Sequence, residues 1–306
     1  MAFEPGPGLT AGVTGSAIKS CLLAARPKTL PAAIVPVWVG CVLAWKLTGV
    51  FHPWLACCTL VGALSIQIAT NFFNDAIDSA KGADTARRLG PVRVTASGLL
   101  RPHAVMGMAA GFLALACGCG VVLYQAHGWP IAVIGMPSLF LAYGYTGGPF
   151  PLAYRGMGEI FVIAFFGLIA VTGTVFIQTG AWPPAADLLG LQTGLLSAVL
   201  ISINNARDRE EDSTTGKRTL AVRFGPHVAT AVIRLEIQLA ALAGLAWIAF
   251  GRPGLALACV PVVLLGWRIL RGVRTLPPGP EFNRLLAMGG VQLILFAASF
   301  HLAACF

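Results

Sequence analysis

The 306-residue chain is unusually apolar and carries few charges. Residues of the AVILMFWYC set make up 57%, the mean hydropathy is +0.78, and charged residues are only 11%, against about 25% in ordinary soluble domains. A soluble fold cannot bury so much apolar surface, so composition predicts an integral membrane protein and excludes disordered, collagen-like and disulfide-scaffold classes. The net charge of +9 does not indicate a nucleic-acid partner, because nucleic-acid-binding proteins are not this apolar.

Nine apolar segments are candidates to cross a bilayer, which needs about 20 apolar residues per helix. In chain order they are Leu30–Val50, Trp54–Phe73, Ala104–Leu123, Trp129–Tyr145, Glu159–Gln178, Ala186–Ile203, Val228–Phe250, Leu255–Trp267 and Leu285–Phe306. The eighth is the shortest. The pattern predicts an all-α, multi-pass membrane protein with nine transmembrane helices. We expect a flexible N-terminus over residues 1–25, ending in a short interfacial helix at Ser16–Ala25, and a single transmembrane domain over residues 26–306.

The basic residues alternate between loops as the positive-inside rule requires. With nine spans, the N-terminus and every second loop fall on one side, and these segments carry 18 of the 21 Lys and Arg residues. The sequence therefore predicts that the basic loops face the cytoplasm and that the C-terminus lies outside.

Acidic residues gather in two short windows. Of the twelve carboxylates in the chain, seven belong to these windows: Asp75, Asp78, Asp84, Asp208, Glu210, Glu211 and Asp212. Each window follows an apolar segment, and the two are separated by about half of the helical array. This weak internal repeat predicts two related halves around a central cavity, each contributing one polar cluster.

The spacing within each window places its polar residues on one side of a helix. Asn71, Asp75 and Asp78 are at i, i+4 and i+7, and Asn204, Asp208 and Asp212 are at i, i+4 and i+8. Acids near hydrocarbon are costly and repel one another, so a cation must neutralise them. Mg²⁺ has the right preference for oxygen and typically takes one or two carboxylates together with phosphate oxygens.

Basic residues follow both acidic windows. They are Lys81, Arg87, Arg88 and Arg93 after the first, and Arg207, Arg209, Lys217, Arg218 and Arg223 around the second. Acids that hold a metal beside bases that hold oxyanions are typical of a magnesium–diphosphate site. The alternative is a pair of solvated interfacial loops whose charges simply offset one another.

Three stretches resemble the UbiA-type intramembrane prenyltransferases. They are NFFNDAIDSAKGADTARRLGPVR, the YRGMGE segment at Tyr154–Glu159, and NNARDREEDSTTGKRTLAVRFG. The first contains the family's NDxxD pattern at Asn74–Asp78, and the third contains its DxxxD pattern at Asp208–Asp212. The third acid of the first motif is displaced to Asp84, a spacing shared by the branch that prenylates 1,4-dihydroxy-2-naphthoate in menaquinone synthesis.

This resemblance implies specific roles. Asp75, Asp78, Asp208 and Asp212 would be catalytic and would bind Mg²⁺. The diphosphate of a polyprenyl donor would contact Asn74, Lys81, Arg88, Arg93, Arg155 and Lys217. Further candidates are Asn71, Asp84, Asn204, Tyr154 and Glu159. The Tyr154 ring would stabilise an allylic cation, and Glu159 would either hold the acceptor hydroxyl or be an interfacial acid. The resemblance also implies a bacterial inner-membrane location, a lipid environment, and prenyl transfer to 1,4-dihydroxy-2-naphthoate with loss of CO₂ and diphosphate, giving demethylmenaquinone.

Two alternatives stay open at the level of sequence. Another aromatic acceptor of the same family, such as 4-hydroxybenzoate or homogentisate, would use the same acids. A secondary transporter also contains intramembrane acids and internal repeats. The dense arginine beside the acids, and their place at the edge of the membrane, favour the prenyltransferase.

Overall fold

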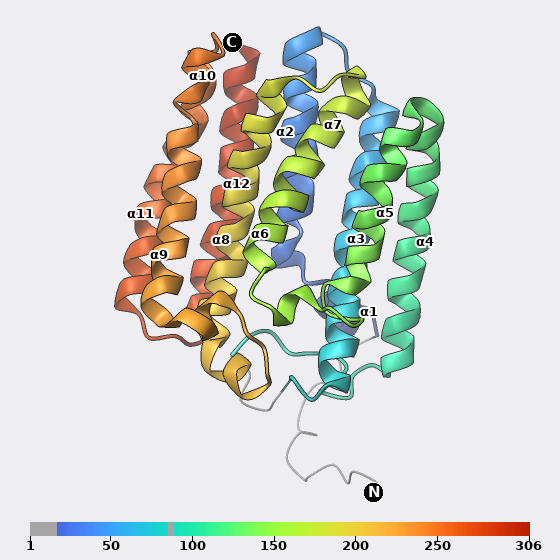
Figure 1. The fold of residues 1–306 in the computed structure, drawn as a ribbon, viewed down its shortest axis with the longest axis vertical. Helices are drawn as coiled ribbons and strands as arrows, with labels where there is room; N and C mark the ends of the chain where they lie inside the picture. Colours follow the sequence, from blue (N-terminus) through green and yellow to red (C-terminus); the bar gives the residue numbers. More distant parts are fainter. Residues whose placement is uncertain (1–16, 85–88) are drawn as a thin grey trace, which may run out of the picture.

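The computed structural model describes residues 17–84 and 89–306. Within these ranges the chain forms helices and connecting segments without a strand (Figure 1). In chain order the elements are α1 (Ala17–Ala25), η1 (Pro27–Thr29), α2 (Pro31–Thr48), α3 (Pro53–Ala80), α4 (Pro102–His127), α5 (Trp129–Gly144), η2 (Leu152–Tyr154), α6 (Gly158–Val162), η3 (Ile163–Ile169), α7 (Ala170–Thr179), α8 (Pro184–Thr214), α9 (Leu220–Ala243), α10 (Ala246–Ala249), η4 (Pro253–Ala258), α11 (Cys259–Thr275) and α12 (Phe282–Cys305).

The predicted all-α membrane class is confirmed. In the described residues, eight helical segments are long and apolar enough to cross a membrane, and the shorter apolar helix α5 supplies a ninth. Three of the predicted ends were wrong, because α3 continues past Phe73, α8 past Ile203 and α11 past Trp267. Loss of apolar sequence marks where a helix leaves hydrocarbon, whereas the helix itself continues through polar residues that are good helix formers.

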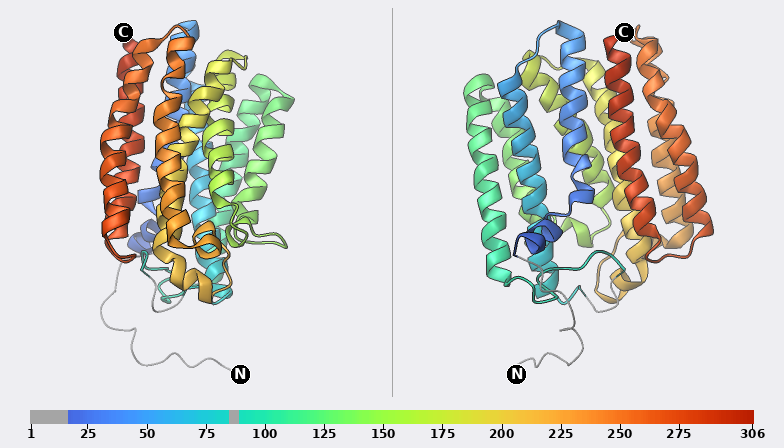
Figure 2. Two further views of the ribbon diagram at one scale, coloured as in Figure 1. Left: turned by 60° about the vertical axis from the view of Figure 1, so that its left-hand side comes forward. Right: turned by 180° about the vertical axis from the view of Figure 1, so that it is seen from behind.

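The helices alternate in direction, so alternate connections lie at the same end of the bundle. The N-terminal helix α1 and the connections α3–α4, α5–α6, α8–α9 and α11–α12 lie at one end, and the C-terminus lies at the other (Figures 1 and 2). The predicted basic segments thus gather at one end of the fold, apart from residues 1–16 and 85–88, which lie outside the described ranges.

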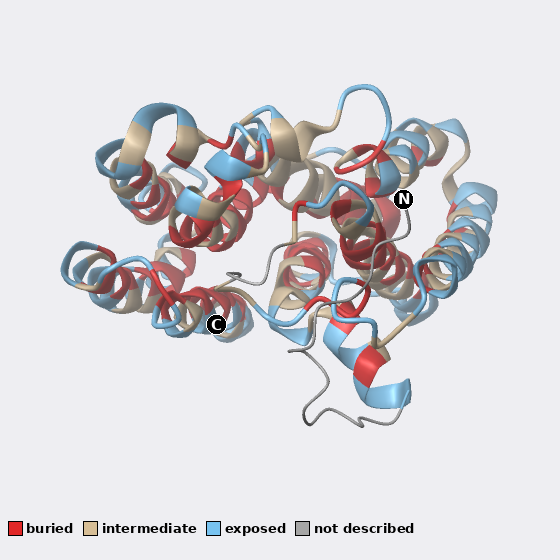
Figure 3. Ribbon diagram, turned by 90° about the horizontal axis from the view of Figure 1, so that it is seen from below, coloured by how far each residue is buried: buried red, intermediate tan, exposed pale blue. Residues whose placement is uncertain are grey.

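Helix α8 lies at the centre of the packing. The largest apolar core joins it to α2, α7, α9, α11 and α12 through fully buried residues such as Val39, Val171, Leu196, Ile233, Val262 and Phe296. Viewed from the end that carries the basic segments, the buried residues face the interior between the helices (Figure 3). A rigid central helix is a suitable base for functional groups at its end.

Close packing against α8 depends on glycine. The helical span Gly158–Thr179 contains a π-helical segment, η3, which crosses α8 where Gly167 meets Gly190 and Gly194. A Cβ on Gly167 would lie 2.4 Å from the carbonyl oxygen of Gly190, so only glycine permits this approach. Small residues at helix crossings are a common way to bring membrane helices together.

Candidate active site

A polar cavity of about 210 Å³ lies between the ends of α3 and α8. Its wall includes most of the predicted polar residues: Asn71, Asn74, Asp78, Arg93, Asn204, Asp208, Asp212 and Lys217. The fold therefore brings the two acidic windows, which are far apart in the sequence, to the same cavity.

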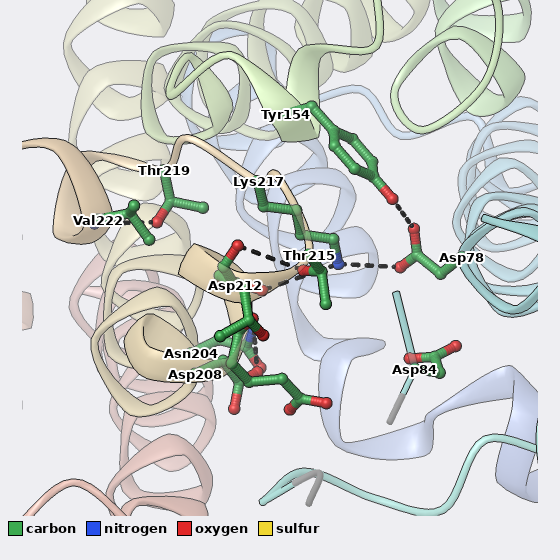
Figure 4. A network of polar contacts seen from close by, with 12 residues as sticks. Asp78, Asp84, Tyr154, Asn204, Asp208, Asp212, Thr215, Lys217, Thr219 and Val222 are labelled. Atoms are coloured by element: carbon green, nitrogen blue, oxygen red, sulfur yellow. Dashed lines mark hydrogen bonds and ion pairs between the residues drawn. The ribbon is translucent and has the colours of Figure 1, made fainter. Parts of the chain in front are cut away.

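One lysine bridges the two windows. Lys217 Nζ lies 3.1 Å from Asp78 Oδ2 and 3.9 Å from Asp212 Oδ1 (Figure 4). Arg93 Nη2 donates a second charged hydrogen bond to Asp78 Oδ2 at 3.1 Å. The two carboxylates thus face a common point that is suited to positive charge.

Tyr154 completes the environment of Asp78. Its hydroxyl donates to Asp78 Oδ1 at 2.9 Å, while Lys81 Nζ and Lys217 Nζ lie 4.4 and 5.5 Å from the centre of its ring. Burial, followed by the negative charge of Asp78, raises the pKa of Tyr154 above its ordinary value. The Tyr154 hydroxyl therefore stays protonated and serves as a fixed donor. The face of the Tyr154 ring already contacts the ammonium groups of Lys81 and Lys217.

Asp208 belongs to a second network centred on Arg207. The buried Arg207 guanidinium donates to both oxygens of Asp208, at 2.6 and 2.7 Å, and to Asn204 Oδ1 at 2.8 Å. It also donates to Asn283 Oδ1 at 2.6 Å, and Asn283 Nδ2 donates to the carbonyl of Leu89 at 3.0 Å. This chain of contacts ties the acid of α8 to the start of α12 and to the connection after α3.

Two of the predicted aspartates do not line the cavity. Asp75 is almost fully buried, and its two oxygens accept the backbone N–H groups of Thr95, at 2.8 Å, and Val94, at 3.2 Å. Asp84 accepts from Arg93 Nε at 3.1 Å. Both carboxylates therefore hold the segment that positions Arg93.

The remaining predicted residues divide between the cavity and its surroundings. Asn74 lines the cavity and accepts a hydrogen bond from the Thr146 hydroxyl, while Lys81 donates to the carbonyl of Thr146 at 2.7 Å. Arg155 is exposed and stacks on the Phe150 ring, with 4.5 Å between the guanidinium carbon and the ring centre. The cavity wall therefore contains Asn74 but neither Lys81 nor Arg155.

Glu159 is buried behind the cavity wall. Asn205, which does line the cavity, donates to Glu159 Oε1 at 2.9 Å. Arg88, the last predicted diphosphate contact, lies outside the described residues.

The residues fit a divalent cation held jointly with a ligand oxyanion. Among the described residues, no three His, Cys, Asp or Glu side chains converge into a metal cluster. Mg²⁺ does not need one, because it usually takes one or two carboxylates with phosphate oxygens and water. The ammonium of Lys217 between Asp78 and Asp212 marks a place where two carboxylates already receive a cation. In addition, Arg93 Nη1 is buried without a hydrogen-bond partner in the described part of the chain, so one donor stays available for an oxyanion.

An apolar cavity of about 240 Å³ adjoins the polar one. The two share five wall residues: Ala32, Thr70, Tyr145, Val162 and Phe166. The apolar cavity continues between α3, α4, α5 and the η3–α7 span as far as Leu123 and Ile177. A ligand with a charged head and a long apolar tail matches this pair of cavities.

Several site residues were not assigned to the site by the sequence analysis. The sequence analysis gave no role to Gln67, Thr146 or Asn283. It listed Arg207 among the basic residues around the second acidic window but gave it no role of its own. Arg26, which directly follows the expected interfacial helix at Ser16–Ala25, also lines the polar cavity. The proximity of Arg26 to a proline was visible in the sequence, but its backbone conformation was not.

The fold and the site define an integral membrane protein with a polar cavity between two acidic helix ends and an adjoining apolar cavity among its helices. The chain belongs to the UbiA prenyltransferase family, which matches residues 33–298. The expected family resemblance is thereby confirmed.

Named relatives and a solved structure agree with this assignment. The chain is 33% identical to a 1,4-dihydroxy-2-naphthoate octaprenyltransferase of Mycobacterium leprae, over 89% of this chain and 92% of that one. It is 41% identical to the enzyme of the same name from Mycobacterium tuberculosis, over 66% and 68% of the two chains. The fold is similar to that of a UbiA homolog from Archaeoglobus fulgidus bound to DMAPP and Mg²⁺, with a TM-score of 0.62, 15% identity, and coverage of 94% and 99%.

Proposed function

We propose that the protein transfers a polyprenyl group from polyprenyl diphosphate to 1,4-dihydroxy-2-naphthoate, with loss of diphosphate and CO₂, giving demethylmenaquinol, the hydroquinone form of demethylmenaquinone. The observation that carries this proposal is the Lys217 bridge between Asp78 and Asp212 at the mouth of an apolar cavity. Identity to enzymes named for this acceptor supports the choice of substrate.

The donor head would lie in the polar cavity. Asp78 and Asp212, with Asp208 and the amide oxygens of Asn74 and Asn204, are the residues that would hold Mg²⁺. When bound, Mg²⁺ would supply Lewis-acid stabilisation to the leaving diphosphate, and the UbiA homolog from Archaeoglobus fulgidus bound to DMAPP and Mg²⁺ supports the choice of this metal. Arg93 and Lys217 would neutralise the remaining negative charge. Asp75 and Asp84 position the Arg93 segment rather than a metal.

The donor tail would lie in the apolar cavity. Each CH₂ group removed from water is worth about 0.8 kcal/mol, so a polyprenyl chain favours this path strongly. The shared wall at Tyr145 and Phe166 would place the reactive allylic carbon beside two aromatic rings, which stabilise positive charge.

The reaction proposed here balances without a net proton. The C–O bond to diphosphate breaks, and the ring carbon that bears the carboxylate forms the new C–C bond. The ring–carboxylate bond then breaks to release CO₂, and its electron pair restores the aromatic ring, so the product of this step is the hydroquinone, demethylmenaquinol. The site therefore needs cationic groups to neutralise two anions, the diphosphate and the acceptor carboxylate. This need is greater than the need for a general base.

We also propose that this site faces the cytoplasm of a bacterial inner membrane and that the C-terminus lies outside. The site and the C-terminus occupy opposite ends of the bundle (Figure 1), and the segments around the site contain most of the basic residues. The positive-inside rule then orients the chain.

An activity assay tests the proposal. Purified protein in nanodiscs would receive a polyprenyl diphosphate and either 1,4-dihydroxy-2-naphthoate or 4-hydroxybenzoate, with Mg²⁺ or with EDTA. We expect demethylmenaquinol with the first acceptor, detected as demethylmenaquinone after oxidation in air, and neither with EDTA. Product with 4-hydroxybenzoate alone would overturn the acceptor, and no diphosphate release with either would overturn the enzyme class.

A further inference from the structure

Arg26 has an unusual backbone at the edge of the polar cavity. Its φ of 51° is the only positive φ of a non-glycine residue in the described chain, and its side chain lines the cavity. The left-handed region is unfavourable for a residue with a Cβ, and such strain persists only where the surroundings impose it.

Two amides of α3 impose this conformation. Asn71 Nδ2 donates to the Ala25 carbonyl at 2.9 Å and to Thr29 Oγ1 at 3.2 Å, and Gln67 Nε2 donates to Thr29 Oγ1 at 3.3 Å. The Thr29 hydroxyl gives its own proton to the Arg26 carbonyl at 3.0 Å. The turn is thus fixed from both sides, and Arg26 is directed into the cavity.

The same network fixes the orientation of Gln67. Because the Thr29 hydroxyl proton is already used, Thr29 Oγ1 accepts, and only the NH₂ group of Gln67 fits against it. Gln67 Oε1 is left buried without a hydrogen-bond partner in the described residues. The residue is only 8% exposed, and it lines the cavity. An unpaired buried acceptor is costly, and because this one lines the cavity it is placed to receive a donor from a ligand.

The position of Gln67 separates this subsite from the diphosphate. Gln67 lies seven residues before Asn74 on α3, which is about 10 Å deeper along the helix axis. A carbonyl oxygen repels an oxyanion, so Gln67 cannot face a diphosphate, but it can accept from a hydroxyl group. Gln67 lies three residues before Thr70 on α3, and Thr70 is one of the residues that line both cavities.

We propose that Arg26 and Gln67 form the binding subsite for the aromatic hydroxy-acid acceptor. The Arg26 guanidinium binds the ring carboxylate, and Gln67 Oε1 accepts a hydrogen bond from a ring hydroxyl. On the opposite wall, the Ser197 hydroxyl is also buried without a partner among the described residues and faces the same ligand. This inference rests on the proposed function and names the residues that select its acceptor.

Substrate fragments test each contact separately. The stable inhibitors 1-hydroxy-2-naphthoate and 1-naphthol differ only in the carboxylate, so the ratio of their inhibition constants reports the carboxylate contact. Arg26→Gly removes the guanidinium and also relieves the strain, because glycine adopts a positive φ freely. We expect the variant to bind 1-hydroxy-2-naphthoate about 30-fold or more weakly, as for loss of a buried charge partner, with 1-naphthol nearly unchanged.

The hydroxyl contact is tested in the same way with Gln67→Leu. This variant should lose the preference for 1-hydroxy-2-naphthoate over 2-naphthoate, which lacks the hydroxyl. Lys28→Gln is the matched control, because Lys28 is an exposed cation two residues away that does not line the cavity. It should keep both preferences.

The outcomes distinguish this inference from the proposed function. If the wild-type protein prenylates 1,4-dihydroxy-2-naphthoate and Arg26→Gly keeps the carboxylate preference, the subsite is wrong and the function stands. A rise in the donor KM with an unchanged acceptor KM would instead assign Arg26 to the diphosphate and overturn the subsite. If the wild-type protein neither binds nor prenylates the acceptor, both fail.

Discussion

Asp78 at the end of α3 and Lys217 just beyond α8 form an ion pair of 3.1 Å across 139 residues of sequence. Lys217 reaches Asp78 because its backbone N–H is held by the Asp212 carbonyl at 3.1 Å, which turns the chain back over the end of α8. The two acidic helix ends are therefore joined directly, and Asp78 accepts hydrogen bonds from Arg93, Tyr154 and Lys217.

Asp78→Asn should remove prenyl transfer almost completely. The amide keeps the volume but loses the charge that Lys217, Arg93 and a divalent cation require. We expect a fall in kcat of about 100-fold or more, in the range seen when a key electrostatic group is removed. Diphosphate release would be measured at saturating Mg²⁺. Turnover near the wild-type rate would contradict the central role of Asp78.

Asp75→Asn should act through the backbone instead. One of the two N–H groups at Val94 and Thr95 would lose its acceptor, at a cost of about 1–3 kcal/mol to local stability. Faster hydrogen exchange of these two amides should accompany reduced activity, because the neighbouring Arg93 loses its position. An inactive variant with unchanged exchange would show that Asp75 acts on the substrate directly.

Lys217→Met should weaken donor binding. Without the ammonium, Asp78 and Asp212 repel each other and the incoming diphosphate. We expect the KM for polyprenyl diphosphate to rise roughly 10-fold or more, as for the loss of a charge-assisted contact worth about 1.5–3 kcal/mol. Steady-state kinetics with varied donor would measure this. Lys46→Met, at the far end of α2, is the control and should behave as the wild type.

Tyr154→Phe should reduce activity about 10-fold, because it removes a hydrogen bond to an ionised carboxylate. Because the pKa of Tyr154 is raised, its hydroxyl stays protonated at pH values up to about 10, the ordinary pKa of a tyrosine. The pH–rate profiles of the wild type and the variant should therefore have the same shape up to about pH 10. An alkaline limb that disappears in the variant would contradict this assignment.

Gly167→Ala should destabilise the fold rather than the site. The new methyl group would lie 2.4 Å from the Gly190 carbonyl oxygen and the Gly194 Cα, and such overpacking typically costs about 1–3 kcal/mol. Gly118→Ala is the matched control, because its Cβ meets nothing within 4 Å on the exposed face of α4. Thermal unfolding in detergent should separate the two variants, and equal Tm values would contradict the close crossing.

The sequence was sufficient to predict the helical membrane fold and the place of the acids near the ends of two helices. It did not predict which acid of a helix enters the cavity, because residues at i+4 and i+7 lie only about 60° apart around the helix axis. Asp78 therefore enters the cavity while Asp75 turns toward the backbone at Val94 and Thr95. Arg26 was not assigned to the site because a left-handed arginine depends on distant amides, and no local pattern encodes it.

The contact between Arg207 and Asn283 has a consequence for biosynthesis. Asn283 belongs to α12, which is synthesised after every acid of the cavity, yet through Arg207 it connects Asp208 to the segment at Leu89. A partly synthesised chain that ends before α12 already contains every acid of the cavity but lacks this link. We therefore expect the enzyme to become competent only after α12 has entered the membrane.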